Sequence, residues 1–394
     1  MWSKRRRRLL DRLTDHGLAV FFSTPQFVDT MQPAFYPYLD RNFYYLTGLE
    51  LPGLALLLDR DRGEAILYAS ETSVEKLPPD IWRGEVRRPG EQFRSDVLER
   101  CQRKGATVWF FTYETSPLEE KNQYGELAAA IARQVGEQAL KNSFPILKEL
   151  RRRKEPEEIQ YIREAIQYTQ EALDQTMRNL QARGWEYEAL ADYTYGLSRK
   201  GRGVSFQMAA SGPNALQLHY LESSRKSLPG EMILFDVGAL SHYYTSDISR
   251  TYPMNGKFSE RQREIYQIVL EAQQMASQML RPGICYRQID DAVKRFYGKA
   301  LRAIHLIRLE EEVSRYYYHG IGHPMGLYVH DPGSMEEPVV EQGVYTLEPG
   351  LYIQEEGMGI RIEDDYLVTR EGAENLSQNI VKAVSEIEGQ MQKS

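Results

Sequence analysis

The chain has 394 residues, of which 42% are hydrophobic and 27% are charged, and its formal net charge is −7. This balance is that of a globular protein with a large core, and the length exceeds the ~100–200 residues usual for one domain. The acidic charge argues against nucleic acid as a partner, and the apolar run at residues 54–58 is far shorter than the ~20 residues that a membrane-spanning helix needs. Only Cys101 and Cys285 are present, so we expect no disulfide framework and a cytoplasmic location.

The first part of the chain predicts an α/β domain over residues 1–145. Short apolar runs bounded by turn residues predict strands at residues 18–22, 54–58, 65–68 and 107–111. Apolar residues at helical spacing predict helices near residues 91–102 and 118–134. The arginine-rich start of the chain, at residues 5–8, is expected to form a solvated first helix.

A second domain is predicted over residues 155–390. It follows a basic run at residues 148–154, and Pro156 is well placed to begin a helix. Helical patterns cover residues 157–180, 185–199, 259–280 and 286–304, with Ser259 as a predicted cap. Between them, residues 243–251 are expected to return antiparallel to the strand at residues 232–234 and to form a hairpin.

Four acidic residues stand at the ends or on the faces of predicted strands. Asp236 ends an apolar strand and Asp247 follows eleven residues later, so a hairpin can put both carboxylates on one face. Glu348 ends another apolar strand, and a period of two puts Glu363 on one face with Arg361 and Asp365. Each acid alone is more typical of a turn or a strand surface, and it is their joint occurrence that points to a site.

Three of the seven histidines lie within residues 319–331. In an extended segment, residues four apart share a face, so we expect His319 and His323 to face one site. Pro324 keeps this stretch extended, because a residue before proline avoids the helical region. His330 has the opposite parity, so a bend, for which Gly326 is suited, must turn it toward the same site.

Carboxylates crowded together repel one another and hold protons unless cations are bound. Two divalent ions remove this penalty and can activate water for hydrolysis. Four carboxylates and one imidazole, with no sulfur, favour Mn²⁺, although Zn²⁺, Co²⁺ and Fe²⁺ also accept such ligands. Nucleophile-elbow, phosphate-loop and H-E-x-x-H motifs are absent from the sequence. The pattern therefore predicts a dinuclear metal hydrolase.

The order of these motifs resembles the dinuclear metallopeptidases of the pita-bread fold, which include methionine aminopeptidase, Xaa-Pro aminopeptidase (aminopeptidase P) and prolidase. The motifs are Phe235–Asp236–Val237–Gly238, Ser246–Asp247–Ile248–Ser249–Arg250–Thr251, residues 319–331, Thr346–Leu347–Glu348–Pro349–Gly350 and Ile362–Glu363–Asp364. The front of the chain, with Tyr36–Pro37–Tyr38, residues 42–48 and residues 80–84, is similar to the N-terminal domain of aminopeptidase P. The resemblance implies an α/β N-terminal domain followed by an α+β pita-bread catalytic domain, an antiparallel sheet covered by helices.

The resemblance also implies a role for each residue of the site. Asp236 would hold one metal, Asp247 and Glu363 would bridge two, and His323 with Glu348 would hold the other. A metal-bridging hydroxide would attack the carbonyl of the Xaa-Pro bond, with Glu348 as proton acceptor. His330 and His219 would face the substrate, and His319 and Arg361 would support the ligands. Trp82 would reach the cleft of a neighbouring subunit, unless it is a core residue of its own domain.

As a whole, the resemblance implies an enzyme that releases the N-terminal residue from peptides with proline in second position. It also implies a homodimer or homotetramer. The first alternative is a prolidase that cleaves Xaa-Pro dipeptides. Others are a non-catalytic pita-bread binding module and a metal-free, creatinase-like hydrolase. Pro324 departs from the family, in which a bulky or aromatic residue often follows the ligand histidine.

Overall fold

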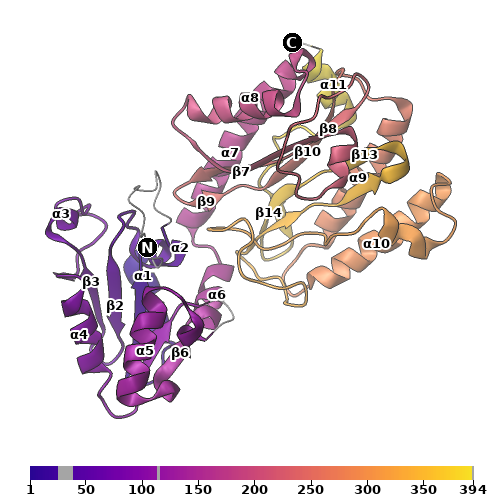
Figure 1. Cartoon of the computed structure of the whole chain (residues 1–394). Coiled ribbons are helices and arrows are strands. Elements are labelled where there is room, and N and C mark those ends of the chain that lie inside the picture. The colour runs from indigo at the N-terminus through magenta and orange to yellow at the C-terminus, as the bar shows by residue number, and fades with distance from the viewer. Residues whose placement is uncertain (25–38, 113–115, 393–394) are drawn as a thin grey trace. The chain divides into compact units, whose positions relative to one another are not determined.

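The computed structural model describes residues 1–24, 39–112 and 116–392. It divides into two compact units, Met1–Leu150 and Arg151–Ser394 (Figure 1). The predicted motif Tyr36–Pro37–Tyr38 lies outside the described residues. Within the described part of the chain, no helix has the length and apolar character needed to cross a membrane.

The first unit is built on a six-stranded sheet in the order β4-β3-β2-β1-β5-β6. Its central strands pair antiparallel, β1 with β2 and β2 with β3, and its outer pairs are parallel. All four strands expected from the sequence are present, and the short edge strands β4 and β6 were not expected. The strands are β1 (Gly17–Phe22), β2 (Ala55–Asp59), β3 (Glu64–Tyr68), β4 (Glu85–Arg87), β5 (Thr107–Phe110) and β6 (Leu140–Asn142).

Helices pack against this sheet. Buried apolar side chains of α4 and α5 meet those of the strands in one core, so both of the helices predicted in this part of the chain form. The described helices are α1 (Trp2–Leu10), α2 (Arg41–Thr47), α3 (Glu71–Val74), α4 (Glu91–Arg100), α5 (Gln123–Val135) and α6 (Phe144–Arg152). The expectation of a solvated first helix is wrong at Arg5, which is fully buried. Its guanidinium lies 4.1 Å from the ring centroid of Tyr45 and donates to the carbonyl of Tyr45.

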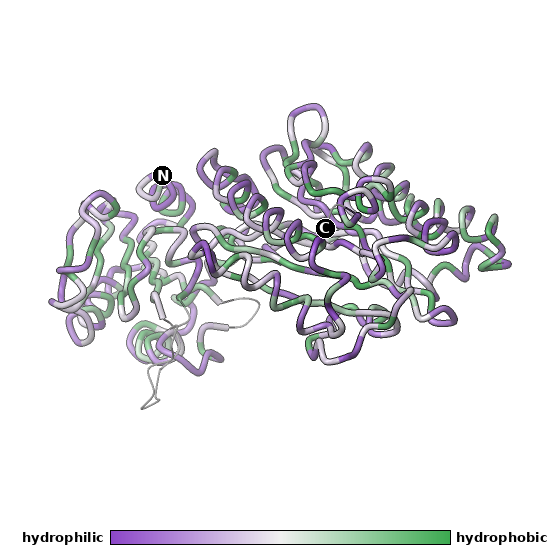
Figure 2. The backbone as a smooth tube through the Cα atoms, turned by 90° about the horizontal axis from the view of Figure 1, so that it is seen from above, coloured by the Kyte–Doolittle hydropathy of each residue, from purple (hydrophilic) through white to green (hydrophobic). Residues whose placement is uncertain are grey.

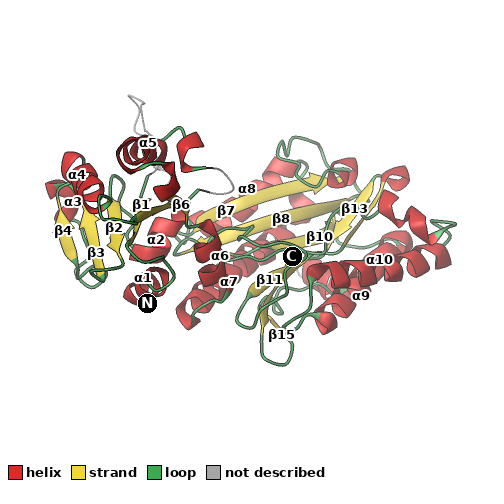
Figure 3. Cartoon of the chain, turned by 90° about the horizontal axis from the view of Figure 1, so that it is seen from below, coloured by secondary structure: helices red, strands yellow, loops and turns green. Residues whose placement is uncertain are grey.

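The second unit contains three antiparallel sheets (Figure 3). The predicted hairpin is confirmed, because β8 pairs antiparallel with both β9 and β10. The strands are β7 (Gly203–Ser211), β8 (Met232–Ser241), β9 (Tyr244–Thr245), β10 (Ile248–Pro253), β11 (Val344–Leu347), β12 (Gly350–Ile353), β13 (Met358–Arg361), β14 (Asp364–Val368) and β15 (Ala373–Asn375). The β7–β10 sheet lies beside the β11-β14-β15 sheet and the β12-β13 pair.

Long helices cover these strands. Helix α7 packs along β8, α8 packs on α7 and β7, and α9 packs against β11, β12 and β13. The helices are α7 (Pro156–Asn179), α8 (Glu186–Ser198), α9 (Glu260–Met279), α10 (Tyr286–Ala303) and α11 (Val384–Met391). Figure 2 shows hydrophilic stretches along the outer helices and hydrophobic ones along the strands, as expected for helices with one buried face.

Helix α9 illustrates how the sequence sets this arrangement. The Ser259 hydroxyl accepts from the backbone N–H of Gln262, and the Gln262 side chain accepts from the N–H of Ser259, which is a capping box. About three turns further on, the fully buried Gln273 donates to the carbonyls of Leu347 and Ile362. These carbonyls directly precede Glu348 and Glu363, so α9 fixes the two chain segments that carry the glutamates.

Candidate metal centre

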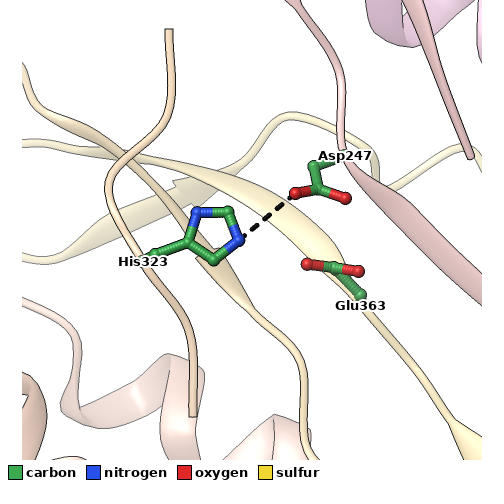
Figure 4. A group of neighbouring side chains, drawn as sticks. All are labelled: Asp247, His323 and Glu363. Carbon is green, nitrogen blue, oxygen red and sulfur yellow. Dashed lines mark ion pairs between the residues drawn. The ribbon is translucent and has the colours of Figure 1, made fainter. Parts of the chain in front are cut away.

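Three of the predicted ligands form a compact cluster (Figure 4). The ligand atoms of Asp247, His323 and Glu363 all lie within 4.8 Å of one another. His323 Nε2 is 3.3 Å from Asp247 Oδ2. Asp247 lies between β9 and β10, and Glu363 lies in the break between β13 and β14. Two breaks between consecutive strands and the histidine segment therefore bring one nitrogen and two carboxylates together.

The other two predicted ligands adjoin this cluster. Glu348 Oε1 is 3.6 Å from His323 Nε2. The Ser249 hydroxyl donates to Glu363 Oε2 at 2.7 Å and also lies 3.4 Å from Asp236 Oδ1. All five residues line one cavity of about 520 Å³ in the second unit. The structure thus brings together four carboxylates and one imidazole, a donor set that fits oxygen-preferring divalent cations.

Backbone pairing explains why His323 and Glu348 meet. The Thr346 N–H donates to the carbonyl of His323, and the Glu348 N–H donates to the carbonyl of Ile321, both at 2.9 Å. Gly322 lies between these bonds, and a Cβ at this position would stand 2.2 Å from the Thr346 carbonyl oxygen. Only glycine allows this close approach of the two chain segments.

The carboxylates of the cluster repel one another strongly. Burial raises the pKa of Asp247 well above its usual value, and the charges of Asp236, Asp365 and Glu348 add to the effect. Burial and then Asp247 raise the pKa of Glu363 in the same way, and burial raises that of Glu348. Bound cations would relieve this repulsion, because they replace protons as the neutralising charge.

A hydrogen-bonded chain runs away from the cluster through Arg361. Its guanidinium donates to Asp236 Oδ2 at 2.7 Å, to the Ser249 hydroxyl at 2.7 Å and to the Tyr352 hydroxyl at 3.1 Å. Tyr352 lies 2.9 Å from His319 Nε2, and His319 Nδ1 lies 2.8 Å from the Gly320 carbonyl. Since a carbonyl only accepts, Nδ1 carries the proton and Nε2 accepts from Tyr352. Burial and the charge of Arg361 lower the pKa of His319 to about 3, so its ring is neutral.

His330 and His219 line the same cavity. The ring centroids of His330 and His323 are 4.1 Å apart at an interplanar angle of 69°. Burial, followed by the charge of His323, lowers the pKa of His330 to about 4. The apolar side chains of Phe206, Leu218, Val329 and Met335 and the backbone of Gly320 and Gly322 complete the cavity wall.

The loop that carries His219 is held by one buried acid, Glu186 at the start of α8. Its carboxylate accepts from the Ser211 N–H at 2.6 Å, the Tyr220 hydroxyl at 3.0 Å and the Arg225 N–H at 2.8 Å. The Asn214 amide also donates to it, at 3.1 Å. Donors from both ends of the segment 211–225 thus converge on one side chain, which fixes the backbone around His219.

Trp82 is the one predicted site residue outside this cavity. It lies in the first unit and is 6% exposed. The Arg6 guanidinium lies 4.5 Å from its ring centroid. This packing favours the alternative of a local core residue, and the reach of Trp82 toward a neighbouring subunit stays a prediction.

Sequence reasoning missed several residues around the cluster. Ser249 lies within a motif, but a hydroxyl between strand residues has no spacing that marks it. Tyr352, Gln273 and Glu186 are equally unmarked. Asp365 was expected to share a face with Glu363, but it does not line the cavity, because the break at residues 362–363 interrupts the strand period. Its Oδ2 instead accepts from the Asp247 N–H at 3.1 Å.

Comparison with known proteins agrees with this geometry. Residues 160–370 match metallopeptidase family M24, and residues 2–97 match the aminopeptidase P N-terminal domain. An Xaa-Pro aminopeptidase from Escherichia coli is 31% identical over 433 residues, covering 99% of this chain and 97% of the relative.

Two solved structures also match. A Bacillus anthracis protein described as an aminopeptidase P has a TM-score of 0.92 at 31% identity, and zinc-substituted E. coli aminopeptidase P in complex with product has a TM-score of 0.89 at 25% identity. Each match covers 100% of this chain and 98% of the other. These matches confirm the predicted fold class and the prediction of an enzyme. The chain belongs to metallopeptidase family M24, in its aminopeptidase P branch.

Proposed function

We propose that this protein is a dinuclear metal aminopeptidase that releases the N-terminal residue from peptides with proline in second position. The observation that carries the proposal is the cluster of Asp247, His323 and Glu363, with Asp236 and Glu348 on the same cavity wall. Its relatives support the substrate class, since the E. coli protein is an Xaa-Pro aminopeptidase. Residues 1–145 would form the N-terminal domain and residues 155–390 the catalytic domain.

The five ligands would hold two divalent ions. Asp236 would serve one ion, Asp247 and Glu363 both, and His323 with Glu348 the other. Oxygen-rich ligands favour Mn²⁺, and the zinc-substituted relative supports an exchangeable divalent site. When bound, the ions supply Lewis acidity and lower the pKa of a coordinated water.

The residues of the chain would handle the proton and the substrate. Glu348 is the proposed proton acceptor, because its carboxylate lines the cavity beside His323, where it can reach a water held at the cluster. His330 is neutral at pH 7, so a ring N–H can donate to the oxygen of the scissile carbonyl. His219 would face the peptide from the opposite loop. Arg361 would hold Asp236 in place and His319 would support Tyr352, which keeps the cluster rigid.

We also propose a homo-oligomer, a dimer or tetramer, as the resemblance to the family implies. A cytoplasmic location stays a prediction from the sequence. The proposed chemistry of the site depends on neither the oligomeric state nor the location.

A peptide series tests the proposed function. The purified enzyme, supplied with Mn²⁺, Zn²⁺, Co²⁺ or Fe²⁺ in turn, is given Xaa-Pro dipeptides, Xaa-Pro-Xaa tripeptides and longer peptides. We expect tripeptides and longer peptides to be cleaved after the first residue, with the highest rate in Mn²⁺.

Matched peptides with alanine in place of proline are the control and should be cleaved much more slowly. Cleavage of dipeptides alone would instead identify a prolidase. Full activity of a protein shown by elemental analysis to hold no metal would contradict the metal-dependent chemistry.

A further inference from the structure

The position of the His330 ring depends on the backbone of its loop and not on hydrogen bonds made by the ring itself. Among the described residues, the His330 side chain has a ring contact with His323 and no hydrogen bond. Rings that act in catalysis usually depend on a partner that fixes their orientation. The backbone of residues 324–331 must therefore supply what a hydrogen bond to the ring does not.

Asp331, the next residue, closes this loop twice. Its backbone N–H donates to the Pro324 carbonyl at 2.9 Å, which joins the two ends of the loop. Its Oδ1 accepts from the Tyr328 N–H at 3.0 Å, and the Tyr328 carbonyl accepts from the Gly326 N–H at 3.0 Å. The loop is thus tied to Asp331 at its start, through Pro324, and in its middle, through Tyr328.

The Asp331 carboxylate is also anchored to the start of the second unit. Arg151 Nη2 donates to Oδ1 at 2.5 Å, and Lys154 Nζ donates to Oδ2 at 3.2 Å. All three side chains are at least 96% buried. Burial alone would raise the pKa of Asp331, but the two cations hold it below its usual value, so the group is a carboxylate. Lys154 is itself fixed, because its N–H donates to the Gln342 carbonyl.

Stability alone does not explain this buried group of charges, because replacing a buried ion pair by apolar residues often leaves the free energy of unfolding unchanged. The packing around it is tight: a Cβ at Gly326 would lie 2.7 Å from Asp331 Oδ2 and 2.9 Å from Lys154 Cε. The charges instead hold the loop of residues 324–331, which connects His323 to His330, in a single geometry.

We propose that Asp331 is a positioning residue of the reaction. Arg151 and Lys154 anchor its carboxylate, and Asp331 holds the His330 ring beside His323, where His330 can donate a hydrogen bond to the substrate. This inference rests on the proposed role of His330. It adds a group that touches neither the ligand cluster nor the cavity, because Asp331 is absent from the cavity wall.

A double-mutant cycle tests it on the full-length, Mn²⁺-loaded enzyme, with an Xaa-Pro-Xaa tripeptide as substrate. Asp331→Ala is expected to lower kcat about 10- to 100-fold, with KM nearly unchanged and metal content retained. In a His330→Ala background, the same substitution should change kcat by less than about threefold, because the group it positions is gone.

Asp59→Ala is the matched control. Asp59 is a fully buried aspartate of the first unit that also accepts from two cations, Arg100 at 2.6 Å and Arg103 at 2.8 Å. We expect it to lower the midpoint of urea unfolding as Asp331→Ala does, with kcat unchanged. If Asp331→Ala does not fold, Asp331→Asn keeps the side-chain shape and Lys154→Met breaks the anchor from its other side. Both should lower kcat in a manner that depends on His330.

The outcomes separate the two proposals. An unchanged kcat in His330→Ala alone would overturn the role of His330 and this inference with it. If His330→Ala lowers kcat and adding Asp331→Ala lowers it further by the full factor, only the positioning role of Asp331 would be overturned. An equal loss of kcat in Asp59→Ala would reduce the effect of Asp331 to general stability and would also overturn it.

Discussion

At the scale of single residues, Ser249 is the junction of the candidate metal centre. Its hydroxyl has one proton, which it donates to Glu363, and its oxygen accepts from Arg361 Nε. Arg361 in turn donates to Asp236. One small side chain thus connects Asp236, which is proposed to serve one ion, with Glu363, which is proposed to serve both. A hydroxyl in this position orients its neighbours without occupying a ligand site itself.

Ser249→Ala should therefore weaken metal binding without abolishing it. Removing the hydroxyl leaves Glu363 without its donor and Arg361 Nε without its acceptor, and loss of such a supporting group typically costs about 10- to 100-fold in metal affinity. Isothermal titration of the metal-free protein with Mn²⁺ measures the change. Ser241→Ala is the control, because the Ser241 hydroxyl donates to Glu164, away from the cavity, and its Mn²⁺ affinity should equal that of the wild type. Equal affinities in all three proteins would contradict the junction role.

At the scale of elements, α9 acts on the site through Gln273. This side chain donates to the buried carbonyls that precede Glu348 and Glu363 and accepts from the half-buried Lys382 Nζ, so it joins three segments of the chain. Unsatisfied buried groups of this kind cost ~1–3 kcal/mol each.

Gln273→Met, which keeps the side-chain length, should lower the free energy of unfolding by about 2–4 kcal/mol and also weaken Mn²⁺ binding. Urea unfolding of the metal-free variant measures the first effect and Mn²⁺ titration the second. The exposed neighbour Gln274 offers the matched control, since Gln274→Met should stay within ~0.5 kcal/mol of the wild type. A destabilised variant that binds Mn²⁺ normally would show that α9 supports the fold but not the ligands.

Element prediction worked where one pattern dominated. The spacing of apolar residues along α9 and its Ser259 cap are both local features of the sequence. The same is true of the apolar runs of β1, β2, β3 and β5. The short edge strands β4 and β6 have no such run, because each pairs on one side only. Arg5 was misjudged because an arginine in a basic run is normally solvated, whereas this one stacks on Tyr45, forty positions away. That contact is tertiary and leaves no local trace.

At the scale of the whole molecule, the candidate metal centre links stability to pH and to metal. Burial raises the pKa of Asp247 and Glu363, so the folded metal-free protein holds protons that the unfolded chain has released above about pH 4. The contribution of these groups to stability is present below the unfolded pKa and is lost as the pH rises through the folded pKa. A cation takes the place of the lost protons.

The stabilisation by a fixed free concentration of Mn²⁺ should therefore grow as the pH rises above about 4, the unfolded pKa of these carboxyls, and it reaches about 2.7 kcal/mol at the pH where that concentration equals 100 times Kd. Urea unfolding with and without Mn²⁺ at several pH values measures it. Carboxylates far from the candidate metal centre cancel in this difference, because metal binding leaves their pKa values unchanged. An Asp247→Asn variant should lose most of the pH dependence. A stabilisation that is constant with pH would mean that the ligands are already ionised in the metal-free protein.

The candidate site was predictable as a set of residues and not as a geometry. Nine of the ten predicted residues line one cavity. The distances among them depend on pairings between segments more than a hundred positions apart, such as Asp247 with Asp365, and no local pattern encodes those pairings. For Trp82 even the location was not predictable, because its sequence context did not distinguish a core residue from an interface residue.

The close approach of Gly322 to the Thr346 carbonyl has a consequence for directed evolution of this enzyme. Any larger residue at position 322 would push apart the two segments that carry His323 and Glu348. A library that seeks a new metal preference should therefore leave this glycine untouched and diversify the apolar cavity wall at Phe206, Leu218 and Met335, whose side chains offer no ligand atom. In a mutational scan, position 322 should be as intolerant as the ligands themselves, although it offers no atom to a metal.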